Sequence, residues 1–125
     1  MNKSNINGVN GETLAAKFLV KKGYEIAALN YRCRQGEIDI IAGDDEYILF
    51  VEVKSRNENA LYLPREAVDE AKQKKIILTA LQYIAATGIE LQPRFDVLEV
   101  YSDSKNPNKA KINHIKNAFS AEGYF

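Results

Sequence analysis

Two apolar segments joined by a short polar turn constrain the fold of this chain more than any other part of its sequence. The first is Glu37–Ala42, Glu-Ile-Asp-Ile-Ile-Ala, and the second is Tyr47–Lys54, Tyr-Ile-Leu-Phe-Val-Glu-Val-Lys. β-Branched and aromatic residues favour strands, and the connecting Gly-Asp-Asp-Glu is typical of a hairpin turn. We therefore predict that the two segments pair as antiparallel strands.

Helical spacing of apolar residues predicts two helices, one on each side of this hairpin. The first covers about Asn10–Lys22, with its asparagine as the N-cap and Gly23 as the stop. The second covers about Asp69–Thr87, with its aspartate as the cap and Gly88 as the stop.

Three further segments are predicted to be strands: Tyr24–Tyr31 and Lys109–Ile115 as edge strands, and Arg94–Val100. The second helix lies between two predicted strands, which allows a parallel crossover. We therefore expect an α/β fold in which helices flank a mixed central sheet.

A length of 125 residues, with 46% hydrophobic and 27% charged residues, predicts a single globular domain over residues 1–125. We expect its ends, about residues 1–9 and 116–125, to be flexible. No segment approaches the ~18 apolar residues of a membrane span, and the start has no apolar signal region. We therefore expect a cytoplasmic protein without a membrane partner, in which the single cysteine, Cys33, forms no internal disulfide.

The overall charge does not indicate nucleic-acid binding, because 17 basic residues balance 17 acidic ones. Basic residues nevertheless cluster in the central third of the chain, where they can face a phosphate backbone. These clusters are Arg32 with Arg34, Lys54 with Arg56, and Lys72 with Lys74 and Lys75.

Three charged residues interrupt the two apolar strands. Because side chains alternate along a strand, Glu52 and Lys54 share one face, and the short turn brings Asp39 close to them. Two carboxylates and the Val53 carbonyl are oxygen ligands of the kind that Mg²⁺ or Mn²⁺ binds beside a substrate phosphate. A lysine there can stabilise developing charge, so the pattern favours phosphodiester hydrolysis. A cross-strand salt-bridge cluster without chemistry fits the same three residues equally well.

Six short motifs of the chain belong together: Gly11-Glu12, Gly36-Glu-Ile-Asp-Ile-Ile-Ala, Phe50-Val-Glu-Val-Lys-Ser-Arg, Ala67-Val, Lys72-Gln73 and Arg94-Phe-Asp-Val. Through these motifs the chain resembles the YraN-like (UPF0102) family of small bacterial proteins. This family is similar to archaeal Holliday-junction resolvases and, by its Asp plus Glu-x-Lys pattern, to the PD-(D/E)XK nuclease superfamily. The resemblance implies a restriction-endonuclease-like fold, a Mg²⁺ or Mn²⁺ cofactor and a DNA substrate.

The same resemblance implies roles for individual residues. Asp39 and Glu52 would be metal ligands, Lys54 the catalytic lysine, Glu12 the helix glutamate that completes the site, and Gln73 the helix glutamine near it. The chain departs from the family at residues 61–64, Leu-Tyr-Leu-Pro, where an aromatic-glycine pair is common, so the substrate preference can differ.

The remaining candidate site residues also fit ordinary roles at the protein surface. Arg56, Lys72 and Lys75 can contact phosphates, although a charged run on a helix is usually its solvated face. Asp96 can pair with a nearby arginine and receives no catalytic role, and His114 is expected at the surface.

Two functions follow from these observations. One is a metal-dependent endonuclease acting on DNA, including branched or structured forms, which can work as a homodimer. The other is a non-catalytic nucleic-acid-binding or adaptor protein that retains the nuclease fold. Cleavage of RNA or of a small phosphodiester needs the same metal chemistry and is not excluded.

Overall fold

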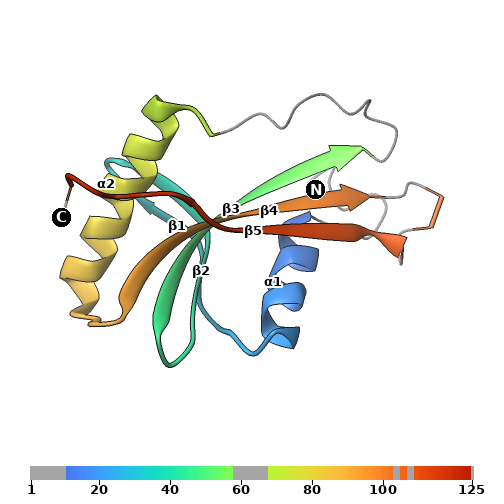
Figure 1. Ribbon diagram of the computed structural model, residues 1–125, viewed down its shortest axis with the longest axis horizontal. Coiled ribbons are helices and arrows are strands. Elements are labelled where there is room, and N and C mark those ends of the chain that lie inside the picture. Colours follow the sequence, from blue (N-terminus) through green and yellow to red (C-terminus); the bar gives the residue numbers. More distant parts are fainter. Residues whose placement is uncertain (1–10, 58–67, 103–104, 107–108, 125) are drawn as a thin grey trace.

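The computed structural model describes residues 11–57, 68–102, 105–106 and 109–124. Within these ranges the chain forms a helix, three strands, a second helix and two strands (Figure 1). The elements are α1 Gly11–Lys21, β1 Glu25–Cys33, β2 Gly36–Gly43, β3 Tyr47–Asn57, α2 Glu70–Thr87, β4 Gln92–Ser102 and β5 Lys111–Phe119.

The strands form one sheet in the order β1-β2-β3-β4-β5. β3 and β4 are parallel, and the other neighbouring pairs are antiparallel. Parallel neighbours need a long crossover, which α2 supplies between β3 and β4. The predicted hairpin, parallel crossover and mixed α/β architecture are confirmed.

Both ends of α2 follow from local chemistry. The Asp69 side chain accepts a hydrogen bond from the Lys72 N–H at 2.8 Å, as predicted for an N-cap. Gly88 ends the helix with a φ of 70°, a conformation that glycine adopts without the steric cost of a Cβ. α1 ends just before Gly23, as predicted, whereas its predicted cap, Asn10, lies outside the described residues.

β5 is longer than the sequence indicates. It runs to Phe119, which lies opposite Phe95 of β4, and the two rings stack with their centroids 5.1 Å apart. Residues 116–119, which we expected to belong to a flexible end, are therefore part of β5, and Phe119 pairs with Phe95 beyond an irregularity in the register. The expected flexible start, residues 1–9, lies outside the described part of the chain.

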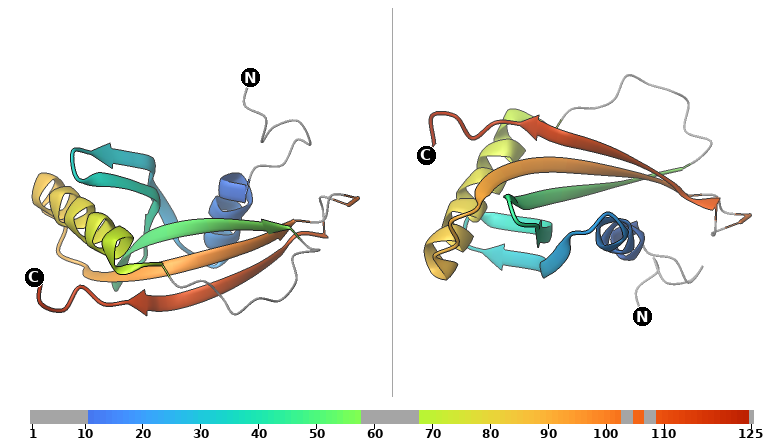
Figure 2. Two further views of the ribbon diagram at one scale, coloured as in Figure 1. Left: turned by 90° about the horizontal axis from the view of Figure 1, so that it is seen from above. Right: turned by 60° about the horizontal axis from the view of Figure 1, so that its bottom comes forward.

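The two helices cover opposite faces of the sheet, and each face has its own apolar core. Figure 2 shows α1 and α2 over different parts of the sheet, while β3, β4 and β5 extend past α2. The core under α2 includes Ile38, Ile41, Phe50, Ile77, Phe95 and Val97. The core under α1 includes Leu19, Ile40, Leu49, Val51, Leu98 and Val100.

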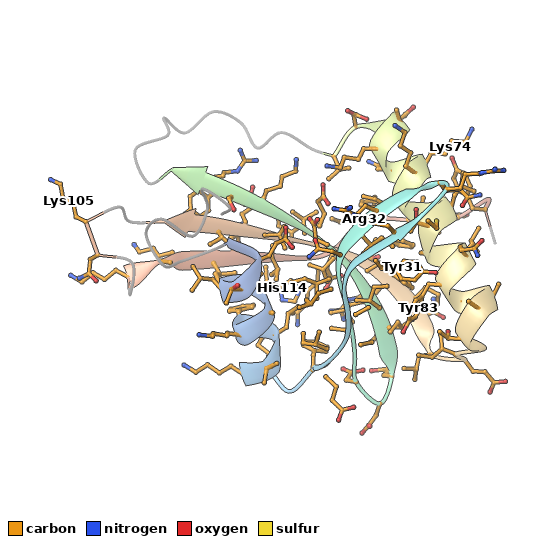
Figure 3. The ribbon with its side chains drawn as sticks, turned by 180° about the vertical axis from the view of Figure 1, so that it is seen from behind. Tyr31, Arg32, Lys74, Tyr83, Lys105 and His114 are labelled. Atoms are coloured by element: carbon orange, nitrogen blue, oxygen red, sulfur yellow. The ribbon has the colours of Figure 1, made fainter. Side chains whose placement is uncertain are left out.

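Aromatic contacts hold α2 to the edge of the sheet. Tyr31 of β1 and Tyr83 of α2 meet edge to face, with ring centroids 5.2 Å apart (Figure 3). α2 thereby ties the edge strand to the middle of the sheet, where Tyr83 also meets Phe50. No helix in the described ranges is long and apolar enough to cross a membrane.

Candidate functional site

Asp39 lies at the point where β2 and β3 separate. The ladder between these strands ends at the Ile40–Val51 pair, and Asp39 and Glu52 are the next residues along the two strands. The Val53 N–H donates a hydrogen bond to Asp39 Oδ2 at 2.8 Å. The Asp39 side chain thus takes the place of a backbone hydrogen bond between β2 and β3. Its carboxyl lies where the two strands separate, which we call the opening.

Glu52 is a buried carboxylate that is neutralised by the second helix. Its side chain is 8% exposed and forms an ion pair with the Lys72 ammonium, in the first turns of α2. The hydrogen bond to Glu52 raises the pKa of Lys72, and the charges of Glu52, Asp39 and Asp69 add to this rise against the opposing effect of burial. The ion pair fixes the start of α2 over the site.

The Asp39 carboxyl holds its proton unusually tightly. Burial, followed by a hydrogen bond with the Glu52 carboxyl, raises the pKa of Asp39 to about 7, although the Val53 N–H opposes the rise. The negative charges of Glu52 and Glu12 raise it further. Two carboxyls in contact cannot both ionise without cost unless a cation lies nearby. Lys72 already neutralises Glu52, and a further cation beside Asp39 would lower the cost of ionising its carboxyl.

A close approach of α1 to the sheet brings Glu12 near Asp39. α1 begins at Gly11, where a Cβ would overlap Ser55 Oγ of β3. The helix can begin this close to the strand because glycine has no side chain. Glu12, half-buried in the first turn of α1, is then near enough to affect the pKa of Asp39.

Lys54 lies on the same face of β3 as Glu52. Val51 packs in the core under α1, whereas Glu52 contacts α2, so the alternation of side chains places Lys54 on the α2 face. Lys54 is half-buried and lies beside Glu99 of β4 in the parallel register. The structure thus brings Asp39 and Glu52 into contact, with Glu12 near Asp39, and Lys54 follows two residues along β3 on the face of Glu52.

The other predicted residues are more dispersed. The Gln73 amide donates to the Val68 carbonyl at 2.6 Å and so holds the chain that enters α2. Lys75 is exposed, and its Cβ lies close to the β1–β2 turn at Gly36. Arg56 pairs with Glu99, with 3.3 Å between Nε and Oε2. Contacts of these residues with nucleic acid stay a prediction.

Two buried carboxylates in β4 were not assigned to any site by the sequence. Glu99, 2% exposed, lies on the face of Lys54 and accepts hydrogen bonds from Tyr101 and Asn113. Its signal was a charge inside the apolar run Phe-Asp-Val-Leu-Glu-Val, the same kind of interruption that marked Asp39.

The second of these, Asp96, lies on the α1 face and is fully buried. It pairs with Arg94, as predicted, at 2.8 Å, and with His114 at 2.7 Å. Burial alone would raise the pKa of Asp96, but hydrogen bonds from His114, Arg94 and the Asn117 N–H hold it below its ordinary value. The expected surface position of His114 is wrong: its side chain is 4% exposed and lies against Phe18 of α1 (Figure 3).

The side chains that the structure describes provide few possible metal ligands in one place. Among them, no group of three or more Asp, Glu, His or Cys is arranged to hold a metal ion. Asp39 and Glu52 nevertheless offer two adjacent carboxyls, and Val53 faces the same opening. The N–H and C=O of a residue in an antiparallel strand face the same neighbour, so the Val53 carbonyl is a third oxygen on that side. The donor set thus fits a hard cation that keeps several waters.

A hollow of about 500 Å³ lies elsewhere, beside the β2–β3 turn. Its lining includes Gly23, Glu25, Asp44 and Leu91, and it contains none of the predicted site residues. The charged site and this hollow are therefore separate features.

Fold and site together define a small mixed α/β protein with paired carboxyls and lysines at one end of a sheet face. The profile described as "Uncharacterised protein family UPF0102" matches residues 11–100, and the chain belongs to this family.

Relatives match over nearly their whole lengths. A UPF0102 protein of Caldanaerobacter subterraneus subsp. tengcongensis is 48% identical over 120 residues, which covers 95% of this chain and 98% of the relative. A UPF0102 protein of Caldicellulosiruptor bescii is 50% identical over 111 residues, covering 87% of this chain and 92% of the relative. One of Clostridioides difficile is 47% identical with the same coverage.

Proposed function

We propose that this protein is a metal-dependent endonuclease of the PD-(D/E)XK type that hydrolyses phosphodiester bonds in DNA, including branched or structured DNA. The observation that carries this proposal is the convergence of the Asp39 and Glu52 carboxyls where β2 and β3 separate, with Lys54 on the same face as Glu52. The mixed sheet with a helix on each face is compatible with a restriction-endonuclease-like fold.

Asp39, Glu52 and the Val53 carbonyl would hold Mg²⁺ or Mn²⁺. The bound ion would supply an acidified water and positive charge for the phosphate oxygens. The proton that Asp39 holds up to about pH 7 would leave, because a ligating carboxylate must be ionised. Lys72, which neutralises Glu52, would become available to a substrate phosphate.

Lys54 would act on the reacting phosphate. As water oxygen bonds to phosphorus and the bond to the leaving oxygen breaks, negative charge grows on the oxygens bound to phosphorus. The Lys54 ammonium would stabilise this charge or orient the attacking water. Glu12, near Asp39, would accept a hydrogen bond from a water in the site.

A second candidate is a non-catalytic nucleic-acid-binding or adaptor protein, and the balanced net charge favours its adaptor form. The chain carries 17 basic and 17 acidic residues, whereas nucleic-acid-binding enzymes usually have a basic excess. In this case the ion pair between Glu52 and Lys72 would persist in the working protein and no cation would replace it.

A cleavage assay separates the two candidates. Duplex, single-stranded, flap and four-way-junction DNAs, with a matched RNA, are incubated with wild type, Asp39→Ala and Lys54→Ala in Mg²⁺ or Mn²⁺. Glu37→Ala is the control, because Glu37 is an exposed carboxylate on the same strand as Asp39 and pairs with Arg32.

We expect cleavage by wild type and Glu37→Ala, and a loss of at least a hundredfold in the two site variants. Cleavage that survives in Asp39→Ala and Lys54→Ala would refute the site. Salt-dependent DNA binding without cleavage under any condition would favour the adaptor.

A further inference from the structure

A second polar cluster lies next to the proposed site and is centred on Glu99. This carboxylate is 2% exposed and lies in β4, between β3 and β5. One of its oxygens accepts hydrogen bonds from Asn113 Nδ2 at 2.9 Å and from the Tyr101 hydroxyl at 3.3 Å. The other accepts from Arg56 Nε at 3.3 Å. Side chains from β3, β4 and β5 thus converge on one buried charge.

The parallel register places this cluster directly beside Lys54. Lys54 of β3 is the partner of Glu99 in β4, just as Phe50 is the partner of Phe95 four residues earlier. The two phenylalanines lie in the core under α2, whereas the Lys54–Glu99 pair follows four residues later in the same strands. Figure 2 shows that these strands extend past α2. The apolar face of the sheet thus continues as a polar one.

Alternation along β3 makes a row of charged residues on this polar face. Glu52, Lys54 and Arg56 follow one another at every second position, a repeat of about 6.6 Å in a strand. A nucleic-acid strand presents its phosphates at a comparable spacing when extended. If Lys54 meets the phosphate that is cut, Arg56 is placed to meet the next one along the same strand.

Glu99 restricts the position of Arg56. A free arginine side chain has many rotamers, and a buried carboxylate is costly unless it is paired and hydrogen-bonded. The Arg56 side chain is 26% exposed, while Glu99 holds its Nε and its Nη2 is buried. A phosphate would therefore reach Arg56 from the exposed side of its side chain. Tyr101 and Asn113 in turn hold Glu99. This chain of contacts fixes a planar donor group, which suits phosphate recognition.

We propose that Glu99 is a positioning residue that holds Arg56 beside Lys54, so that Arg56 binds the phosphate next to the scissile one in a DNA strand lying along β3. This inference rests on the proposed endonuclease function. It also gives the path of the DNA across the site, because the bound DNA strand would pass first Glu52, then Lys54 and then Arg56.

The test is a double-mutant cycle on DNA affinity. Binding of a fluorescent four-way junction and a duplex is measured with Ca²⁺ in place of Mg²⁺ for wild type, Glu99→Gln, Arg56→Gln and the double variant. Arg56→Gln is expected to weaken binding about tenfold and to lower the salt slope by about 0.9, the value for one phosphate contact.

The sign of the Glu99→Gln effect discriminates between explanations. Removing a negative charge near DNA should strengthen binding by simple electrostatics, whereas loss of Arg56 positioning should weaken it. We expect binding about fivefold weaker in Glu99→Gln, and only about twofold further weakening when Arg56→Gln is added, so that the double variant binds about as weakly as Arg56→Gln alone.

Asp96→Asn is a matched control, because Asp96 is also a buried β4 carboxylate paired with an arginine, but on the opposite face of the sheet. It should lower the melting temperature without changing DNA affinity. If Glu99→Gln does not fold, Asn113→Ala, at an exposed position, removes one hydrogen bond from Glu99 and should weaken binding in the same direction.

The results separate this inference from the proposed function. DNA binding and cleavage by wild type, with unchanged or tighter binding by Glu99→Gln or additive effects in the cycle, would overturn the positioning role alone. Equal weakening by Asp96→Asn would overturn it as well, since the effect would then be structural. Failure of wild type to bind any of the nucleic acids would overturn both.

Discussion

Replacing Asp39 by asparagine should change the stability of this protein in a way that depends on pH. The amide keeps the size of the carboxyl and can still accept the hydrogen bond from the Val53 N–H. It cannot ionise, so it removes the repulsion from Glu52 and Glu12 that, with burial, raises the pKa of Asp39 to about 7. The substitution therefore isolates one electrostatic cost.

The sign follows from the proton affinity of the two states. The unfolded chain releases the Asp39 proton near pH 3.9, whereas the folded protein holds it to about pH 7. Wild type therefore loses stability as the pH rises from about 4 to 7, because folding must then take up a proton or bury a charge. A pKa difference of this size corresponds to about 4 kcal/mol at full effect. Solvent screening of a half-buried group should leave about 2 kcal/mol.

Urea unfolding at pH 4 and pH 8 measures this effect. Asp39→Asn should be about as stable as wild type at pH 4 and about 2 kcal/mol more stable at pH 8. Added Mg²⁺ should then stabilise wild type but not the variant, because a ligand that binds only the folded state shifts unfolding by mass action. A difference in stability between the two proteins that does not grow with pH would refute the electrostatic reasoning.

Three further predictions concern other contacts of the structure. Lys72→Met should lower stability by about 1 to 2 kcal/mol in urea unfolding, because it leaves the buried Glu52 carboxylate without its cation. Mg²⁺ should restore part of this loss. An unchanged urea midpoint would contradict a stabilising role of the ion pair between Lys72 and Glu52. Asp96→Asn should lower stability by about 3 kcal/mol at pH 7. The loss should be smaller below about pH 4, because protonation of Asp96 then removes the same stabilising contribution from wild type. A loss of stability that is independent of pH would contradict the lowered pKa of Asp96. Asp69→Ala should cost about 1 kcal/mol in thermal unfolding through the lost N-cap, with Glu70→Ala, at an exposed position, as the control; equal melting temperatures would contradict the capping role.

Local chemistry made most of the elements predictable. The β2–β3 hairpin is encoded by two apolar runs and the turn between them, and the ends of α2 by Asp69 and Gly88. Such signals act over a few residues, so they can be read without the rest of the fold. The end of β5 at Phe119 could not be predicted from the sequence. It depends on strand pairing and ring stacking between Phe119 and Phe95, which belong to different strands of the sheet.

The candidate site likewise combines contacts that the sequence predicts with contacts that depend on the tertiary structure. The proximity of Asp39 and Glu52 follows from a short turn and strand alternation, and it is therefore predictable from the sequence. The ion pair of Glu52 with Lys72 could not be anticipated, because it needs α2 to cross back over the sheet between two parallel strands. The positions of Glu99 and His114 likewise depend on the register among β3, β4 and β5.

Asp39, Glu52 and Lys54 were thus recognisable from the linear order of residues, since charges inside apolar strands stand out and alternation assigns them to faces. Their partners depended on the folded sheet. Lys72 reaches Glu52, Arg56 reaches Glu99 and His114 reaches Asp96 across strands and helices that are distant in sequence. The energy of a buried charge depends on its surroundings in three dimensions, and residues that neutralise it can come from any part of the chain.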